Sequence, residues 1–262
     1  MDFKHLTFDV EDGVATITFD RPAEANAMNL PLMEDLMHAS IRCDEDPGIR
    51  AAVITGRGRF FSAGGDLASF GSAGDDLGPL LKEMTAYFHA AVSRFSRMDA
   101  PLIAAVNGFA AGAGMSLVAA CDLAVAGESA MFVSAYTAAS LSPDGSSTYF
   151  VPRLVGMRRA MELMLTNRRL SSAEALEWGL INRVVPDDAV LSDATDLATE
   201  LASGATVAYG VVKELLHSSL SGTLETQMEI EARRISEMTR TEDGREGIAA
   251  FLAKRAPEFK GR

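Results

Sequence analysis

The chain has 262 residues, 48% of them hydrophobic, which is enough for one large domain with a substantial core. Its formal net charge of −12 argues against a nucleic-acid-binding surface, and no apolar run approaches the roughly 18 residues of a membrane-spanning helix. The two cysteines lack metal-ligand spacing and the N-terminus lacks a signal-peptide pattern, so we expect a cytoplasmic protein without a metal site.

The first predicted elements are two strands and a helix. Residues 6–10 and 14–19 flank a short acidic turn with a glycine, and the second run alternates apolar residues with threonine, which predicts a hairpin. A helix is expected from residue 30 to about residue 43, because its apolar residues have helical spacing and Asn29 can cap its first turn. Residues 51–55 follow as a short buried strand.

Two strand ends lead into loops of small residues. Residues 56–67 form the first such loop, and the acidic, glycine-rich tract 71–78 after it is expected to be mobile. A helix over about 80–98 precedes the apolar run 102–106, which predicts a buried strand followed by an Asn-Gly turn and a helix that begins with Gly and Ala. Small side chains let a ligand approach the backbone, and the first N–H groups of a helix favour negative charge. This second connection between a strand and a helix, residues 107–114, is therefore suited to hold negative charge on a ligand.

Two well-known phosphate-binding motifs are excluded at this connection, residues 107–114. Leu117 stands where the dinucleotide fingerprint needs its third glycine, and no lysine is near enough for a phosphate-binding P-loop. On this stretch alone, close packing of a helix on a sheet through small residues explains the pattern equally well.

The remainder of the chain continues the alternation of strands and helices and ends in helices. Short strands are predicted at 122–126, 131–133 and 183–185, an irregular segment at 134–145, and helices at about 147–154, 158–165, 173–178, 190–203, 207–219, 223–239 and 243–254. Repeated strand, loop and helix units favour an α/β layered fold. We divide the chain into a core at 1–189 and a C-terminal helical region at 190–262.

Two stretches resemble the signatures of the crotonase (enoyl-CoA hydratase/isomerase) superfamily. They are residues 60–67, FFSAGGDL, and residues 107–114, NGFAAGAG. The resemblance runs from the first hairpin through 153–156, 169–175 and 178–185 to residues 251–255. It covers nearly the whole chain and implies a spiral of ββα units whose C-terminal helical region forms homotrimers, often paired into hexamers.

The resemblance also implies an acyl-CoA thioester as substrate, with coenzyme A as part of the substrate and no separate cofactor. It assigns the binding of the thioester carbonyl oxygen to the backbone N–H groups of Gly65 and Ala113. The family more often has Gly at the position of Ala113. Fixed donors stabilise an oxygen that gains negative charge in the transition state. Further substrate contacts are implied at Ala63, Gly64, Asp66, Leu67 and Gly112. Arg21, Arg57 and Arg59 are candidates for the CoA phosphates, although solvated loop positions explain them better.

The reaction depends on the side chains around the acyl group. The two glutamates of the hydratases correspond to Ser116 and Tyr136, so we expect little hydratase activity. Asp144 resembles the aspartate of several isomerases of the family, which moves a proton between carbons, as a carboxylate in an apolar pocket can do. We therefore expect an isomerase of fatty or aromatic acid metabolism that shifts a double bond or rearranges a ring through an enolate, with Asp144 as acid/base.

Other interpretations stay open. Asp144 and His89 also resemble the layout of 4-chlorobenzoyl-CoA dehalogenase, with the aspartate as nucleophile and the histidine as base, although Tyr136 stands where that enzyme has tryptophan. A third alternative is an acyl-CoA binding protein without catalysis, against which Asp144 and both glycine-rich loops argue. The two residues can also have purely structural roles. Asp144 can cap the helix that follows it, and His89 can pack on its own helix.

Overall fold

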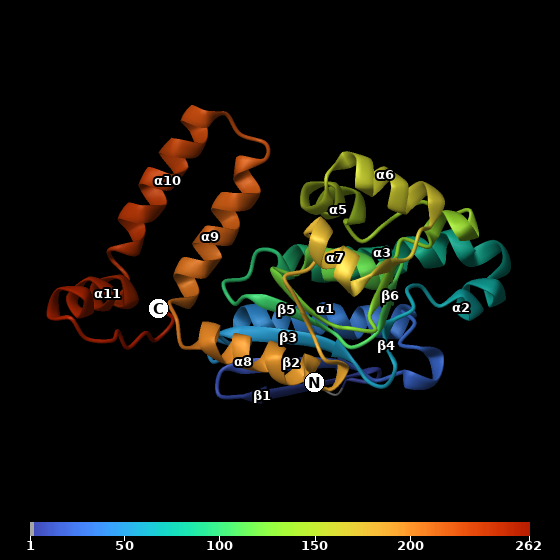
Figure 1. The fold of residues 1–262 in the computed structure, drawn as a ribbon, viewed down its shortest axis with the longest axis horizontal. Helices are drawn as coiled ribbons and strands as arrows, with labels where there is room; N and C mark the ends of the chain where they lie inside the picture. The colour runs from blue at the N-terminus through green and yellow to red at the C-terminus, as the bar shows by residue number, and fades with distance from the viewer. Residues whose placement is uncertain (1–2) are drawn as a thin grey trace.

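The computed structural model, which describes residues 3–262, is built on a six-stranded sheet of order β1-β2-β3-β5-β7-β10 (Figure 1). The predicted hairpin forms its antiparallel edge, and the other neighbouring strands are parallel. Both inner strands at the centre of the sheet, β3 and β5, are buried along their whole length, which explains their uninterrupted apolar sequences. The strands are β1 (Leu6–Glu11), β2 (Val14–Phe19), β3 (Ala51–Gly56), β5 (Leu102–Val106), β7 (Leu123–Gly127) and β10 (Arg183–Val185).

A second sheet of four very short strands corrects the sequence analysis. Its order is β4-β6-β8-β9, formed by β4 (Phe60–Ser62), β6 (Phe109–Ala111), β8 (Met131–Val133) and β9 (Leu170–Ser171). Thus β4 interrupts the expected loop at 56–67, and β6 separates the Asn-Gly turn from the helix expected directly after it. Only β8, at 131–133, was predicted from the sequence. The strands β4, β6 and β9 are too short to show a periodicity, so the pattern did not reveal them. Because β4 and β6 pair in parallel, the segments that follow them lie next to each other.

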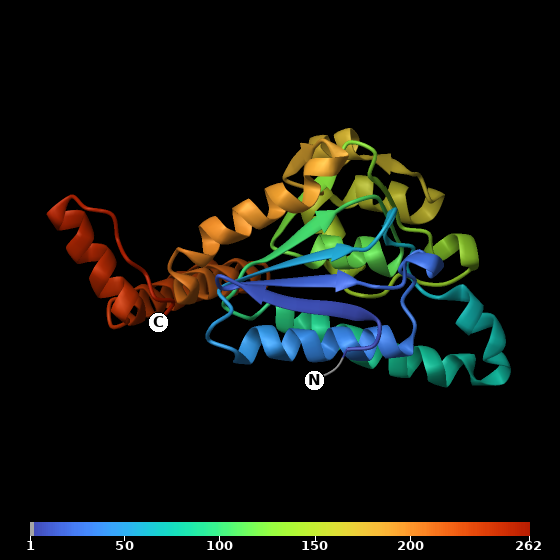
Figure 2. The ribbon, with the colours of Figure 1, turned by 90° about the horizontal axis from the view of Figure 1, so that it is seen from below.

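Helices cover both faces of the larger sheet (Figure 2). The α1 helix begins as predicted, because the Asn29 side chain accepts a hydrogen bond from the Leu32 N–H at 3.1 Å. The α1 and α3 helices pack on one face, and the tract 71–78 is mostly helical, spanning the end of α2, a 3₁₀ turn and the start of α3. The helices of the core are α1 (Leu30–Glu45), α2 (Leu67–Ser72), α3 (Leu77–Phe95), α4 (Ala113–Ala120), α5 (Ser147–Val155), α6 (Met157–Thr166) and α7 (Ser172–Trp178), with 3₁₀ helices η1 (Pro22–Glu24), η2 (Gly74–Asp76), η3 (Tyr136–Ala139) and η4 (Asp187–Ala189).

The four predicted C-terminal helices are present, at α8 (Val190–Ala202), α9 (Thr206–Ser219), α10 (Leu224–Met238) and α11 (Glu242–Ala253). The α8 helix covers the other face of the sheet with a buried row of small apolar side chains. The α9 helix contacts the core through the buried Lys213, whereas α10 and α11 lie farther from the core (Figure 1). A division of the chain at residue 189 and a trimer-forming role for this region stay predictions.

Within residues 3–262, no helix combines the length and apolar character needed to cross a bilayer.

Candidate active site

The backbone N–H groups of Gly65 and Ala113 are candidates for binding an oxygen of a ligand. Gly65 follows β4 and Ala113 begins α4 after β6, and both residues line a cavity of about 250 Å³. Within residues 3–262, neither N–H has a hydrogen-bond acceptor in the protein, whereas the N–H groups of Gly64 and Gly112 both do. Two free donors at one cavity can stabilise an oxygen that gains negative charge.

Glycine at position 64 allows the two loops to approach each other closely. Gly64 has φ +88°, and a Cβ there would lie 2.7 Å from the carbonyl oxygen of Ala111 at the end of β6. A side chain at this position would push the β4 loop away from β6. The spacing of the Gly65 and Ala113 N–H groups therefore depends on a residue that the first signature supplies.

Asp66 stabilises the same loop from within the protein. Its side chain accepts a hydrogen bond from the Ser69 N–H at 3.1 Å, which caps α2, and it pairs with Arg21 Nη2 at 3.0 Å. Burial acts to raise the pKa of Asp66, but the Ser69 N–H and the Arg21 guanidinium together hold that pKa below its usual value. Arg21 also donates to the Ala27 carbonyl, so its hydrogen bonds are made inside the protein.

The other two arginines considered for the CoA phosphates lie at the surface. Arg57 Nε lies 3.0 Å from Asp20 Oδ1 in an exposed ion pair, and the Arg59 guanidinium lies 5.9 Å from the centre of the Phe60 ring.

A chain of three polar side chains connects α4, η3 and the loop before α5. The Tyr136 hydroxyl donates to Asp144 Oδ1 at 2.6 Å and lies 2.9 Å from the hydroxyl of Ser116, which is fully buried. Burial and then the Asp144 charge raise the pKa of Tyr136, so the phenol keeps its proton and acts as a donor. Tyr136 and Asp144 line the same cavity as Gly65 and Ala113. The structure thus brings together residues of the two signatures and the loop before α5.

Helix capping does not account for the Asp144 carboxylate. The α5 helix starts at Ser147 and has Ser146 at its N-cap, without a side-chain capping bond. The Asp144 backbone carbonyl accepts from the Ser147 N–H at 3.1 Å, while the carboxylate accepts from Tyr136. The side chain is therefore free of a capping role and faces the cavity.

His89 lies on the exposed side of α3 and contacts the loop that carries Asp144. Its Nε2 accepts a hydrogen bond from the Gly145 N–H at 3.2 Å. The imidazole lines a different hollow of about 890 Å³ between α3, α5, α9 and α10. His89 is not among the residues that line the cavity of Asp144.

The rest of the Asp144 cavity is mainly apolar, and most of its individual side chains were not singled out from the sequence. Ala63 and Leu67 from the first signature line it. Most of the other lining residues lie in the two segments, about 80–98 and 134–145, that the resemblance implies for the acyl pocket, and the full set is Met33, Phe70, Leu81, Met84, Thr85, Ala135, Ala139, Leu141 and Ser142. These residues have the same types as ordinary core residues, so no sequence signal sets them apart. Among the described lining residues, Asp144 is the only carboxylate.

Comparison with known proteins identifies the family. Residues 9–262 match the family model described as enoyl-CoA hydratase/isomerase. The chain belongs to the enoyl-CoA hydratase/isomerase family. The resemblance stated above is thereby confirmed, and the family's members act on acyl-CoA thioesters.

Relatives of this family member carry three different reaction names. It is 38% identical over 256 residues to the 1,2-epoxyphenylacetyl-CoA isomerase of Escherichia coli K12, covering 97% of each chain. It is 37% identical over 252 residues to 4-chlorobenzoyl coenzyme A dehalogenase-2 of an Arthrobacter species, covering 95% of this chain and 91% of the relative. The crystal structure of an enoyl-CoA hydratase from Polaromonas sp. JS666 superposes with a TM-score of 0.92 at 33% identity, covering 97% and 99% of the two chains. The crotonase fold is confirmed, and the reaction has to be argued from the site.

Proposed function

We propose that this family member is an isomerase of acyl-CoA thioesters that shifts a double bond or rearranges a ring, with Asp144 as the acid/base. The observation that carries this proposal is that Asp144 is the only carboxylate among the described residues lining the cavity of Gly65 and Ala113. A proton shift between two carbons needs one group that takes the proton and returns it. The relative named 1,2-epoxyphenylacetyl-CoA isomerase supports the same reaction class.

The reaction follows from the placement of these groups. The thioester carbonyl oxygen accepts hydrogen bonds from Gly65 and Ala113, and the Asp144 carboxylate removes a proton from a carbon of the acyl group. The electron pair of the broken C–H bond moves toward the carbonyl, and the two N–H groups stabilise the enolate oxygen. Asp144 then returns the proton to a different carbon, so the product has the same mass as the substrate.

Hydration by two carboxylates does not fit this set of side chains. Ser116 and Tyr136 stand at the positions of the hydratase glutamates, and the raised pKa of Tyr136 keeps its phenol from acting as a base. Adding water also requires a second group that positions and activates the water. We expect hydration of crotonyl-CoA to be slow.

The dehalogenase alternative requires a base for the hydrolysis of an aspartyl ester. A relative carries that name, but His89 uses Nε2 to accept the Gly145 N–H and lines the neighbouring hollow. The contact with Gly145 favours a structural use of this histidine. A binding protein without catalysis is disfavoured by the combination of free N–H donors and a carboxylate at one cavity.

A substrate panel tests the proposal. The wild type and Asp144→Asn would be incubated with 3-enoyl-CoA, 2-enoyl-CoA, an epoxyphenylacetyl-CoA and 4-chlorobenzoyl-CoA, followed by ultraviolet absorbance and mass spectrometry. We expect a product of unchanged mass with wild type and no turnover with Asp144→Asn, which should still bind acyl-CoA.

Each other outcome contradicts the proposal in a different way. Exchange of chloride for hydroxyl would support the dehalogenase alternative, and rapid gain of one water would support hydration. Tight binding without any turnover by the wild type would support a binding protein. Equal loss of binding and turnover in Asp144→Asn would contradict the assigned role.

A further inference from the structure

The segment that carries Tyr136 and Asp144 has an unusual backbone. Between residues 135 and 146, three residues other than glycine have positive φ: Ala135 (+61°), Ser140 (+58°) and Ser146 (+67°). Gly145 also has positive φ, at +59°. A residue with a side chain holds this conformation only where its surroundings impose it, and such residues concentrate at functional sites. The contacts that hold the two ends of this segment therefore matter for the position of the Asp144 carboxylate.

The first end is held by Thr137, the neighbour of Tyr136 in η3. Its hydroxyl donates to the Met164 carbonyl of α6 at 2.8 Å and accepts from Asn167 Nδ2 at 2.7 Å. Asn167 follows the last turn of α6 in the left-handed conformation, with φ +53°. Thr137 thus connects η3 to the C-terminal end of α6 through two hydrogen bonds.

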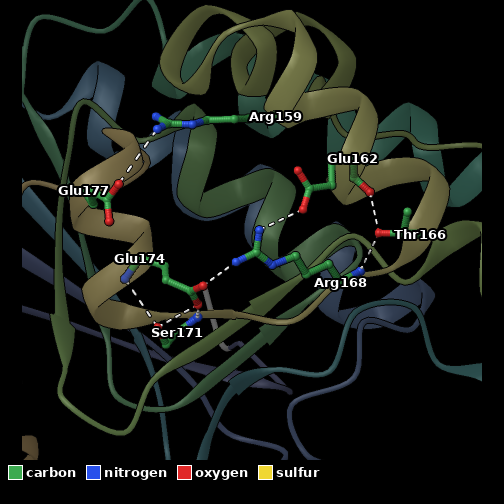
Figure 3. A network of polar contacts seen from close by, with 7 residues as sticks. All are labelled: Arg159, Glu162, Thr166, Arg168, Ser171, Glu174 and Glu177. Carbon is green, nitrogen blue, oxygen red and sulfur yellow. Dashed lines mark hydrogen bonds and ion pairs between the residues drawn. The ribbon is translucent and has the colours of Figure 1, made fainter.

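The end of α6 is itself fixed by a polar network (Figure 3). Arg168 pairs with Glu162 at 2.7 Å and also with Glu174 of α7. The Thr166 hydroxyl donates to the Glu162 carbonyl at 2.6 Å and accepts from the Arg168 N–H at 3.2 Å. Asn167 lies between two anchored residues, so α6 offers η3 a defined point of attachment.

The second end is held by His89. Its Nε2 accepts the Gly145 N–H at 3.2 Å, one residue after Asp144. Gly145 is buried, and a Cβ there would lie 2.3 Å from the Phe88 ring. The backbone after Asp144 thus sits directly on α3, and His89 supplies an acceptor for a buried N–H that would otherwise lack one.

We propose that Thr137 and His89 are positioning residues. They hold the segment 135–146 so that Tyr136 and Asp144 face the cavity. This inference rests on the proposed function, because the group they position is the proposed acid/base. His89 acts as a hydrogen-bond acceptor through an unprotonated nitrogen and takes no part in proton transfer to substrate. Thr137 acts through Tyr136, whose hydroxyl donates to the Asp144 carboxylate.

Matched variants separate these roles. His89→Gln keeps a side-chain acceptor and His89→Leu removes it, while Thr137→Ser keeps the hydroxyl and Thr137→Val removes it. Loss of a hydrogen bond made by His89 or Thr137 should lower kcat of the isomerisation about three- to tenfold. We expect this loss in His89→Leu and Thr137→Val, with KM changed less than about twofold, and near-wild-type kcat in the two conservative variants.

Three further measurements distinguish positioning from a general loss of structure. Thr199→Val, which removes a hydroxyl bonded only within α8, should leave kcat unchanged. In a Tyr136→Phe background, Thr137→Val should add little further loss, because residues that act through one another are not additive. Binding of an unreactive thioether analogue of acyl-CoA should be the same in all variants.

Several results would overturn the inference. His89→Gln as inactive as His89→Leu would mean that the imidazole itself is required, and wild-type kcat in His89→Leu and Thr137→Val would mean that neither residue positions Asp144. Additive losses with Tyr136→Phe would contradict action through Tyr136. If the wild type hydrolyses 4-chlorobenzoyl-CoA, the proposed function fails but the positioning role is measured in that reaction by the same variants. A wild type without any turnover would overturn both.

Discussion

The Arg21 guanidinium lies 3.0 Å from the Asp66 carboxylate, and this pair joins two segments 45 residues apart next to Gly65. Each side chain is only 10% exposed. Asp66→Asn should therefore lower the free energy of unfolding by about 3 kcal/mol, because it leaves the Arg21 charge largely buried without its counter-ion. Urea unfolding followed by circular dichroism measures this change.

An exposed pair of the same chemistry provides the control. Arg57 and Asp20 are also 3.0 Å apart, but their side chains are 56% and 34% exposed. Asp20→Asn should cost less than about 1 kcal/mol. Equal losses in the two variants would show that burial of the Arg21–Asp66 pair does not matter for stability.

The same pair predicts a pH dependence. The pKa of Asp66 is lower in the folded protein than its usual value, so its contribution to stability is complete above the unfolded pKa of about 3.9. The contribution is lost as the pH falls through the lowered pKa of the folded state. The difference in unfolding free energy between wild type and Asp66→Asn should be constant from pH 7 to 5 and shrink below about pH 4. A difference that grows on acidification would contradict this assignment.

The N–H of Ala113 can be removed without deleting a side-chain contact. Ala113 is the first residue of α4, a position where proline is tolerated because its missing N–H has no partner within the helix. Ala113→Pro should lower kcat about 10²- to 10³-fold if this N–H stabilises the enolate oxygen. Ala113→Gly keeps the N–H and should retain most of the activity.

Thermal unfolding of both variants is needed beside the kinetics. A folded Ala113→Pro protein with wild-type kcat would exclude this N–H from the oxyanion site. A large loss of kcat in Ala113→Gly would point to the methyl group as the important feature.

Lys213 anchors the C-terminal helices to the core. Its Nζ lies 2.8 Å from Asp122 Oδ2 and donates to the Phe95 carbonyl at 2.9 Å, and the side chain is 8% exposed. Lys213→Met should lower the unfolding free energy by about 3 kcal/mol, because a largely buried carboxylate loses its partner. Arg233→Met breaks an exposed pair in α10 and should cost less than about 1 kcal/mol. Comparable losses in urea unfolding would contradict an anchoring role for Lys213.

Local pattern predicted much of the fold. The hairpin, the Asn29-capped helix α1 and the four C-terminal helices follow from periodicity and capping, which depend on residues a few positions apart. The helix expected at about 80–98 runs instead from Leu77 to Phe95, a shift of the size that patterns usually leave at helix ends. The short strands β4 and β6 had no such signal.

The sequence by itself determined the family and the two glycine-rich loops, and it named Asp144 as the candidate acid/base, because these depend on residue identity and order along the chain. Only the tertiary structure decided which groups meet. The bond from Gly145 to His89 spans 56 residues, and the Ser116 and Tyr136 hydroxyls are 20 residues apart in the chain. Such contacts depend on how the two sheets and their helices stack, and the packing of a whole core leaves no periodic trace in any one segment.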